Sequence, residues 1–154
     1  MHENKEKKIL GYLKNNCYMN IAISYRDKPY ATTLKYAAEK YELYVAIFKS
    51  SYTAQVLKRN NLIACTIENH NISEFVQIVG EAIVMDSKEE RKKAGEILKA
   101  THENIRFWMY SEDVLFYKIR PNKIKYTLGN VNNKRTDMFG ETYELIIKLS
   151  LIHI

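Results

Sequence analysis

Three predicted strands follow one another within residues 18–48, YMNIAISYRDKPYATTLKYAAEKYELYVAIF. Apolar and polar residues alternate over residues 18–25, which predicts a strand with one buried face. The polar residues 26–29 predict a turn, and residues 30–36, rich in Thr and Tyr, predict the returning strand. Residues 42–48 predict a third strand. Strands with such short connections pair antiparallel.

Few helices are predicted around these strands. Residues 3–15 carry apolar residues at helical spacing and predict a first helix. A second helical segment opens with the Ser-Ser pair 50–51 and ends in the polar run 58–61. Ser87 and Glu90 have the spacing of a capping box and predict the start of a third helix.

The remaining sequence predicts further strands. Residues 62–68 and 74–85 are two of them, and Gly80 inside the second predicts a bulge or a close backbone approach. Residues 115–120 and 123–128 predict two more strands, separated by a Pro-Asn pair.

Residues 143–148 predict a last strand, whereas residues 101–113 fit neither a helix nor a strand pattern. The predicted order is helix, three strands, helix, two strands, helix, then two or three strands. Short connections and few helices favour a mainly β (α+β) antiparallel barrel or sandwich with peripheral helices over a parallel α/β sheet.

The composition is that of one globular domain. The chain has 154 residues, of which 46% are hydrophobic and 27% charged, which excludes collagen-like and wholly disordered classes. No segment approaches the ~18 apolar residues of a membrane span. Two cysteines without a CxxC motif indicate a reduced, cytoplasmic protein. We expect the domain to span residues 1–148, because residues 149–154 match a translated sequencing adapter. The alternative is an ordinary apolar final strand.

The motifs of several enzyme classes are missing from the sequence. It contains no GxGxxG, Walker A, HExxH or GxSxG motif. Its four histidines have no metal-ligand spacing, so we expect no metal site. Cys17 and Cys65 lie in or beside apolar strands, which favours buried hydrophobic residues over nucleophiles.

Residues 48–53, Phe-Lys-Ser-Ser-Tyr-Thr, lie where a strand ends and a helix begins. Free backbone N–H groups and the helix dipole favour an anion at such a junction. The hydroxyls of Ser50, Ser51 and Thr53, with Lys49 beside them, would add donors for a phosphate. The simpler alternative is that Ser50 or Ser51 only caps the helix.

A second element supplies donors that point to the same interpretation. Thr32, Thr33 and Lys35 lie on the preceding strand pair and could reach the same place. Donors that converge from two elements are better explained by a bound phosphate than by a helix cap. For Lys35 alone, the alternative is a solvated strand lysine.

Several runs carry a family resemblance: residues 30–36 (YATTLKY), 43–48 (LYVAIF), 51–61 (SYTAQVLKRNN), 75–82 (FVQIVGEA) and 116–126 (FYKIRPNKIKY). Across about residues 9–128 the chain resembles the pyridoxamine 5′-phosphate oxidase-related, FMN-binding split barrels. The resemblance implies a six-stranded split β-barrel that forms a homodimer, with FMN in a cleft between the subunits. It also implies a flavin-dependent oxidoreductase that acts on a small molecule.

The junction and the resemblance together predict cofactor-binding residues, namely Thr32, Thr33, Lys35, Phe48, Lys49, Ser50, Ser51, Tyr52, Thr53, Gln77 and Trp108. Gln77 would donate to a polar edge of the ring, and the alternative is a solvent-facing strand residue. Phe107 and Trp108 would stack on the flavin, and the alternative is packing in the core or in a dimer interface. No catalytic acid or base is assigned, because the flavin would carry the redox chemistry.

The chain departs from the usual family pattern Ser-x-Lys/Arg, then Leu, then Asn-Pro. Ser51, Leu57 and Asn60 match it, but Thr53 replaces the basic residue and Asn61 replaces proline. The strand that often carries a phosphate-binding Arg has two Thr residues here. Losing a charge-assisted contact weakens phosphate binding. A C-terminal Arg- and His-containing stretch is also missing, so we do not expect oxidation of pyridoxamine phosphate.

Other functions remain open from the sequence. The barrel could hold a deazaflavin or haem, or serve as a non-catalytic binding module. A net charge of +6 and 12 Tyr are also compatible with a barrel that binds single-stranded nucleic acid, because basic grooves and stacking aromatic side chains bind single strands. The basic residues, however, are mixed with Glu on helices and loops and form no single stripe. We therefore expect a small-molecule substrate, and neither a nucleic acid nor a membrane as partner.

Overall fold

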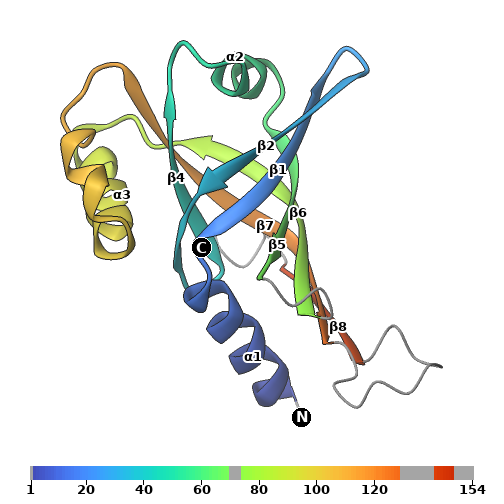
Figure 1. Ribbon diagram of the computed structural model, residues 1–154. Helices are drawn as coiled ribbons and strands as arrows, with labels where there is room; N and C mark the ends of the chain where they lie inside the picture. Colours follow the sequence, from blue (N-terminus) through green and yellow to red (C-terminus); the bar gives the residue numbers. More distant parts are fainter. Residues whose placement is uncertain (1, 70–73, 129–140, 148–154) are drawn as a thin grey trace.

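The computed structural model describes residues 2–69, 74–128 and 141–147, so the predicted tail at 149–154 lies outside the described residues (Figure 1). None of the described helices is long and apolar enough to cross a membrane. The helices are α1 (His2–Asn15), α2 (Tyr52–Arg59), α3 (Lys88–Thr101) and the 3-10 helix η1 (Glu103–Phe107). The strands are β1 (Tyr18–Tyr25), β2 (Lys28–Lys35), β3 (Ala37–Glu39), β4 (Glu42–Phe48), β5 (Leu62–Glu68), β6 (Glu74–Val84), β7 (Val114–Leu128) and β8 (Glu141–Ile146).

The strands form one antiparallel sheet in the order β2-β1-β5-β6-β7-β4-β3, with β8 added beside β7. The sheet curls because residues 28–39 begin at one end of this order as β2 and finish at the other end as β3. In the described sheet, β2 and β4 lie side by side without pairing (Figure 1), which leaves a split in the wall. The predicted antiparallel split barrel is confirmed, with six long strands extended by the shorter β3 and β8.

The predicted alternation of β1 is confirmed and places the core inside the barrel. Met19, Ile21 and Ile23 are buried, whereas the intervening residues are exposed. Burial of such apolar side chains is the main stabilising contribution to the fold. Ile9 and Leu13 of α1 join the same core, so α1 covers one end of the barrel (Figure 1).

That covered end is also where the chain passes from β2 to β3, at Tyr36. The Tyr36 side chain is fully buried, and its hydroxyl donates to the Leu13 carbonyl at 2.7 Å. Its N–H donates to the Cys17 carbonyl at 2.9 Å, and Nε2 of His102 donates to its carbonyl at 2.8 Å. These three bonds tie the crossover to α1, the start of β1 and the end of α3.

The turn between β1 and β2 is shorter than the predicted residues 26–29. Arg26 and Asp27 alone form it, with φ of 51° and 60°. Lys28 and Pro29 already pair with β1. Two consecutive positive φ angles match the right-handed twist of a hairpin, and Pro29 is tolerated because β2 is at the end of the sheet order.

The prediction of two strands at 115–120 and 123–128 is wrong, because β7 runs through Pro121 without a break. The register with β6 shifts there: Val79 faces Lys123 and Gly80 faces Pro121. Asn122 is thus the extra residue of a bulge, and a bulge tolerates a proline that has no N–H to donate. A Cβ on Gly80 would clash with the Arg120 carbonyl oxygen, so the predicted bulge and close approach at Gly80 are confirmed.

Helix α3 begins with the predicted capping box of Ser87 and Glu90. Arg91 on α3 donates to the Val114 and Ser111 carbonyls at 2.7 and 3.0 Å, which fixes the helix to the start of β7. Residues 103–107, for which the sequence predicted no element, form η1, and the chain then returns to β7.

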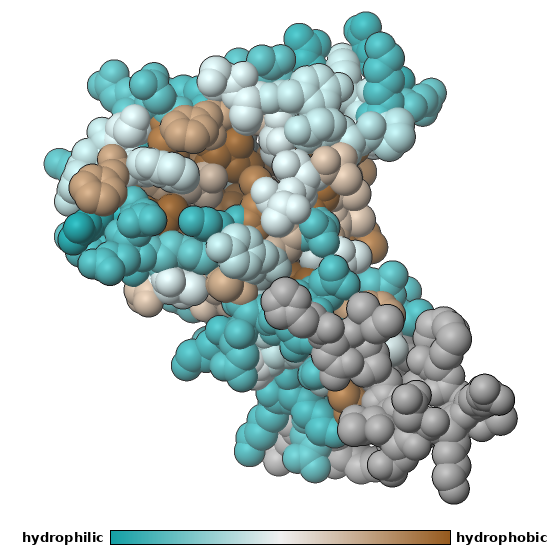
Figure 2. Space-filling view, viewed as in Figure 1, coloured by the Kyte–Doolittle hydropathy of each residue, from teal (hydrophilic) through white to brown (hydrophobic). Residues whose placement is uncertain are grey.

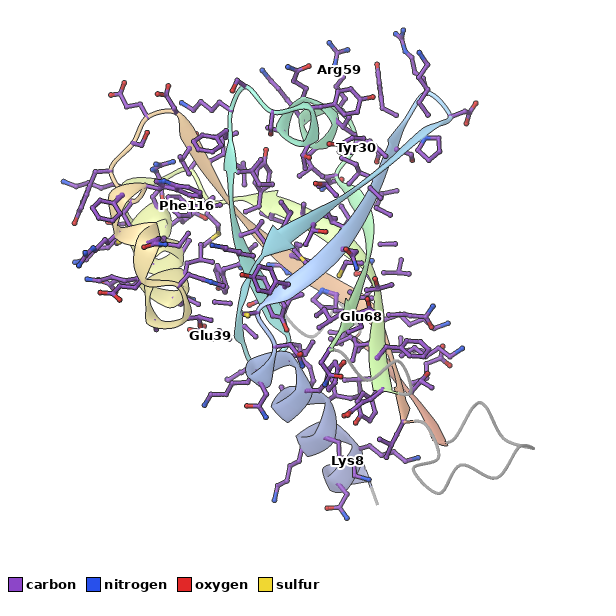
Figure 3. The ribbon with its side chains drawn as sticks, viewed as in Figure 1. Lys8, Tyr30, Glu39, Arg59, Glu68 and Phe116 are labelled. Atoms are coloured by element: carbon purple, nitrogen blue, oxygen red, sulfur yellow. The ribbon has the colours of Figure 1, made fainter. Side chains whose placement is uncertain are left out.

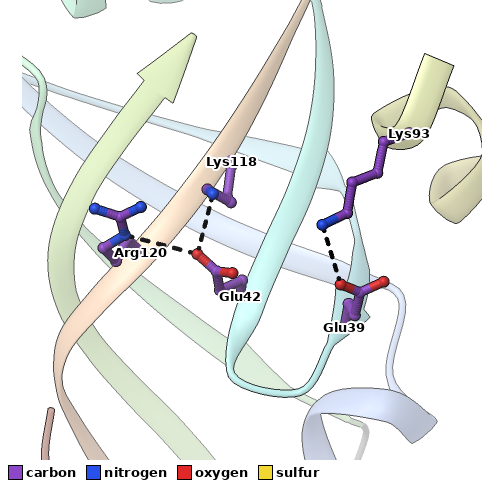
Figure 4. A network of polar contacts seen from close by, with 5 residues as sticks. All are labelled: Glu39, Glu42, Lys93, Lys118 and Arg120. Carbon is purple, nitrogen blue, oxygen red and sulfur yellow. Dashed lines mark ion pairs between the residues drawn. The ribbon is translucent and has the colours of Figure 1, made fainter. Parts of the chain in front are cut away.

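Ion pairs join the strands next to α3 (Figure 4). The Glu42 carboxylate lies 3.4 Å from Lys118 Nζ and 3.7 Å from Arg120 Nε, which connects β4 to β7. Lys93 on α3 pairs with Glu39 on β3 at 3.5 Å. These contacts hold β4, β7 and α3 as one wall of the barrel.

Candidate functional site

A cleft of about 360 Å³ lies at the split between β2 and β4, beneath the first turn of α2. The residues that line it come from β2, β4, α2 and the η1 segment, namely Tyr30, Thr32, Thr33, Leu34, Lys35, Ala46, Ile47, Phe48, Ser51, Tyr52, Thr53, Ile105 and Trp108. Figure 2 shows a hollow with a hydrophobic floor in this part of the surface. Figure 3 shows Tyr30 below α2, at the upper end of the split.

Eight of the eleven predicted cofactor-binding residues line this one cleft. They are Thr32, Thr33, Lys35, Phe48, Ser51, Tyr52, Thr53 and Trp108. They converge because the strand that carries Thr32 curls round to face the end of β4, although the sheet does not pair there.

The other three predicted residues lie outside the cleft of their own chain. Lys49 lines two neighbouring hollows beyond β4. Ser50 is an exposed turn residue. Gln77 is exposed on β6, because its neighbours Val76 and Ile78 turn inward to the core. Gln77 is therefore directed away from the cleft of its own chain.

The first turn of α2 presents backbone donors to the cleft. The Ser51 hydroxyl caps the helix, since it accepts from the Ala54 N–H at 3.1 Å and donates to the Phe48 carbonyl at 2.7 Å. The N–H groups of Tyr52 and Thr53 have no acceptor within the helix. No acidic residue lies in this first turn, so its positive partial charge is not neutralised there.

Few side-chain donors are left for a ligand. The Thr33 hydroxyl already donates to Asn20 Oδ1 at 2.9 Å. Thr53 is buried at the start of α2, and Thr32 is half-buried on β2. Lys35 is exposed at the end of β2 and supplies the one positive side-chain charge among the described lining residues.

Two aromatic pairs flank the cleft, and each pair connects different elements. Tyr30 of β2 contacts Tyr52 of α2 edge-on, with ring centroids 4.9 Å apart. Phe48 at the end of β4 contacts Trp108, with centroids 5.1 Å apart. All four rings are partly exposed, by 36% to 47%. Trp108 is therefore not a core residue, and these rings offer their remaining surface to a flat ligand.

Sequence analysis did not select Tyr30, although a signal was present. Tyr30 and Thr32 are two residues apart on a strand, so their side chains leave the same face of β2. Phe107, proposed as a stacking residue, lies outside the cleft lining and is 70% exposed, with the Arg106 guanidinium 4.9 Å from its ring centroid.

The described cleft lacks the residue types that most often act as general acids, bases or metal ligands. Its thirteen lining residues include no Asp, Glu, His or Cys. Over the described chain, no group of three His, Cys, Asp or Glu side chains could hold a metal ion. Burial raises the pKa of the Cys65 thiol to about 12, so this thiol stays protonated at neutral pH and is a poor nucleophile.

Larger hollows lie on the other side of α2 and β4, with volumes of about 790 and 530 Å³. Charged residues line most of the smaller of these hollows. The larger is lined mainly by apolar side chains, with the charged residues Lys49, Lys58, Arg59 and Asp86 among them. Neither hollow brings aromatic pairs and the start of a helix together. The smaller cleft at the split is therefore the candidate site.

No protein-family model matches the sequence, and no curated protein matches it. Solved structures do match. A Listeria innocua protein assigned provisionally as a pyridoxamine 5′-phosphate oxidase superposes with a TM-score of 0.66 and 20% identity, over 79% of this chain and 97% of that one. An FAD-binding protein from Mesorhizobium loti superposes with a TM-score of 0.65 and 14% identity, over 77% and 90% of the two chains.

A heme binding protein from Mycobacterium smegmatis gives a TM-score of 0.73 at 11% identity, over 92% of this chain and 56% of that one. These similarities, together with the strand order, establish the fold. The chain has the split-barrel fold of the pyridoxamine 5′-phosphate oxidase-like proteins.

Proposed function

We propose that this protein binds a flavin, FMN, in the cleft at the split and acts as a flavin-dependent oxidoreductase on a small organic molecule. One observation carries the proposal: two aromatic pairs, the start of α2 and Lys35 line the same cleft of a split barrel. A flat, polar-edged ligand with an anionic tail matches such a set of contacts.

The lining residues fit the two parts of FMN in different ways. Phe48 and Trp108 would pack on the isoalloxazine ring, with Lys35 as a donor toward a ring edge. The N–H groups of Tyr52 and Thr53 would face the phosphate. These donors are neutral, so they would bind a phosphate less strongly than cationic side chains would.

When bound, the flavin supplies the hydride transfer. The chain binds and orients the ring and excludes water through the aromatic pairs. Because the described lining contains no Asp, Glu, His or Cys, no side chain of these types takes a proton in this cleft. A substrate would therefore be positioned by apolar contact and by the Lys35 and Tyr hydroxyl donors.

We propose that a second copy of the chain completes the site. The rings of the cleft are partly exposed, and Phe107 and Tyr110 next to them are 70% and 89% exposed. A second chain would cover this aromatic surface and could bring Gln77 to the ring edge. Mass measurement in solution, by light scattering, checks for the dimer, and a monomer at working concentration would contradict it.

Haem is the second candidate cofactor, because one of the similar structures is a heme binding protein. The described cleft lining contains no His, Cys or Met, so only Tyr30 or Tyr52 would remain as a usual axial ligand. This donor set favours a flavin or a deazaflavin over haem.

The visible absorption spectrum of the purified protein tests the proposal. We expect flavin bands, and FMN in the supernatant after denaturation. A Soret band would favour haem. A colourless protein that takes up no FMN on reconstitution would contradict flavin binding, and a protein that binds FMN but transfers no hydride to or from any electron donor would support the non-catalytic alternative.

A further inference from the structure

The two ends of the barrel are covered to different extents. At one end, Ile9 and Leu13 of α1 are buried in the core. The shorter helix α2 lies at the other end (Figure 1), and the hollow of about 790 Å³ lies between it and the ends of β6 and β7. Val84 of β6 faces the core residue Tyr117 across the β6–β7 pair, so both side chains lie on the inner face of the sheet. Val84 is nevertheless 44% exposed, which shows that this end of the barrel is not filled.

The wall of this large hollow is mainly aliphatic. Ala54 and Leu57 of α2, Ala82 of β6 and Leu115 of β7 line it together with Val84. Tyr117 is the one aromatic ring in its described lining, whereas the cleft at the split has four. Ligand sites are typically apolar hollows of roughly 300–1,000 Å³, and the mouth of a β-barrel is a frequent place for them.

Tyr117 brings a buried polar group to the hollow. It lines the hollow and is only 5% exposed. Its hydroxyl has no hydrogen-bond partner among the described residues, and unlike the hydroxyls of Tyr41 and Tyr44 it is not fully enclosed by protein. Burial, together with the negative charge of Asp86 in the same lining, raises the pKa of Tyr117 above its ordinary value of 10.0. The hydroxyl therefore keeps its proton at neutral pH and can donate to an acceptor that enters the hollow.

The rim of the hollow carries an excess of positive charge. Lys49 follows β4, and Lys58 and Arg59 end α2, whereas Asp86 is the single acid of the described lining. Lys49 and Lys58 are exposed and form no ion pair with a described residue. Arg59 is held by the Tyr25 hydroxyl at 3.3 Å, which leaves its charge unneutralised. An anionic group is therefore favoured at this rim over a cationic one.

We infer that this hollow is a second ligand site and that it binds an aliphatic carboxylate. The aliphatic body would lie against Leu57, Val84 and Leu115. A carboxylate has two acceptor oxygens, so it can accept from the Tyr117 hydroxyl and from one lysine at the same time. The hollow shares no lining residue with the cleft at the split, so the inference does not rest on the proposed function.

Titration of the full chain with three probes of equal chain length, at neutral pH and by calorimetry, tests the inference. The probes are octanoate, octanol and octylammonium. We expect octanoate to bind about tenfold more tightly than octanol, because charge-assisted bonds add to the same apolar contact, and octylammonium to bind more weakly than octanol. Equal binding of the three probes, or binding of none, would overturn the inference.

A charge reversal at the rim locates the site. Lys58→Glu should remove the preference for octanoate over octanol. Lys99→Glu is the matched control, because it reverses the charge of an exposed lysine in the last turn of α3, outside the hollow. An equal change in the two variants would overturn the inference. If no probe binds and Lys58→Glu converts a dimer into a monomer by light scattering, a second copy covers the hollow and the inference is wrong.

Two further variants separate the hollow from the fold and from the cleft. Tyr117→Phe keeps the ring and should weaken octanoate binding several-fold while leaving octanol binding unchanged, which a purely structural role of Tyr117 would not do. Trp108→Ala changes the cleft and should leave octanoate binding unchanged. Loss of octanoate binding in Trp108→Ala would place the probe in the cleft and overturn the inference.

Discussion

Tyr30 and Tyr36 lie six residues apart at opposite ends of the same split, and their surroundings differ completely. Tyr36 is fully buried, and its hydroxyl, N–H and carbonyl are all hydrogen-bonded to neighbouring elements. Tyr30 is 37% exposed and contacts only the edge of Tyr52 among the described rings. The split is thus closed by a structural tyrosine at one end and opened into a cleft at the other.

This difference separates the contacts that stabilise the barrel from the candidate site. At the closed end, hydrogen bonds between Tyr36 and α1, the start of β1 and the end of α3 hold the two edges of the sheet together. At the end beside α2, Tyr30 makes no comparable set of hydrogen bonds among the described residues. Substitutions at the two ends should therefore separate, with stability lost at one and ligand affinity lost at the other.

The largest expected effect is at the closed end. Tyr36→Ala should lower the free energy of unfolding by about 3–5 kcal/mol, because it leaves a cavity and removes the bond to Leu13. Tyr30→Ala, at a partly exposed position, should cost less than about 1 kcal/mol. Urea denaturation of both variants measures this, and equal losses would contradict the division between the two ends.

Trp108→Ala tests the open end. Loss of one stacking ring should weaken flavin binding about tenfold and leave the free energy of unfolding nearly unchanged. Tyr18→Ala is the control, since Tyr18 is also a partly exposed ring and lies outside the lining. Equal affinities of the two variants would show that the ligand does not contact Trp108.

Ser51 both lines the cleft and stabilises the fold, because its hydroxyl caps α2. Ser51→Ala removes the cap of α2 and should destabilise the protein by about 1 kcal/mol. Ser50→Ala, an exposed turn position, should leave stability unchanged. A thermal or urea comparison in which both variants behave alike would contradict the capping role.

The last expected effect is a dependence on alkaline pH at the closed end. Burial, helped by the negative charge of Glu74, raises the pKa of Tyr12 to about 12, above the ordinary value of 10.0. The folded state holds this proton more tightly than the unfolded state, so the stabilisation is complete below pH 10 and is lost as the pH rises toward 12. Unfolding free energies should fall less steeply above pH 10 in Tyr12→Phe than in the wild type. Parallel curves would contradict the assignment.

Local patterns predicted most elements because each has a local cause. The alternation in β1 and the capping box at Ser87 depend on neighbouring residues, and a glycine inside a strand pattern marks a place where another backbone comes close. The continuity of β7 through Pro121 could not be predicted, because it depends on the register with β6 far away in sequence. A proline is tolerated only when the partner strand places a bulge opposite it.

The candidate site was predicted in part for the same reason. Ser51 and Thr53 share one strand–helix junction, which is visible in sequence, and the sequence predicts that Thr32, Thr33 and Lys35 reach it from the preceding strand pair. Which face of β6 turns outward depends on the core, and it directs Gln77 away from the cleft of its own chain. The pairing of Tyr30 with Tyr52 arises only when the sheet curls.

The most direct test of flavin binding in this cleft uses Trp108, the single tryptophan of the sequence. Its ring lines the cleft beside Phe48, so a flavin bound in this cleft would lie next to it. Titration with FMN should quench the emission and saturate at one flavin per chain. Unchanged tryptophan emission at flavin concentrations that saturate the protein by another measure, or no binding at all, would contradict the account.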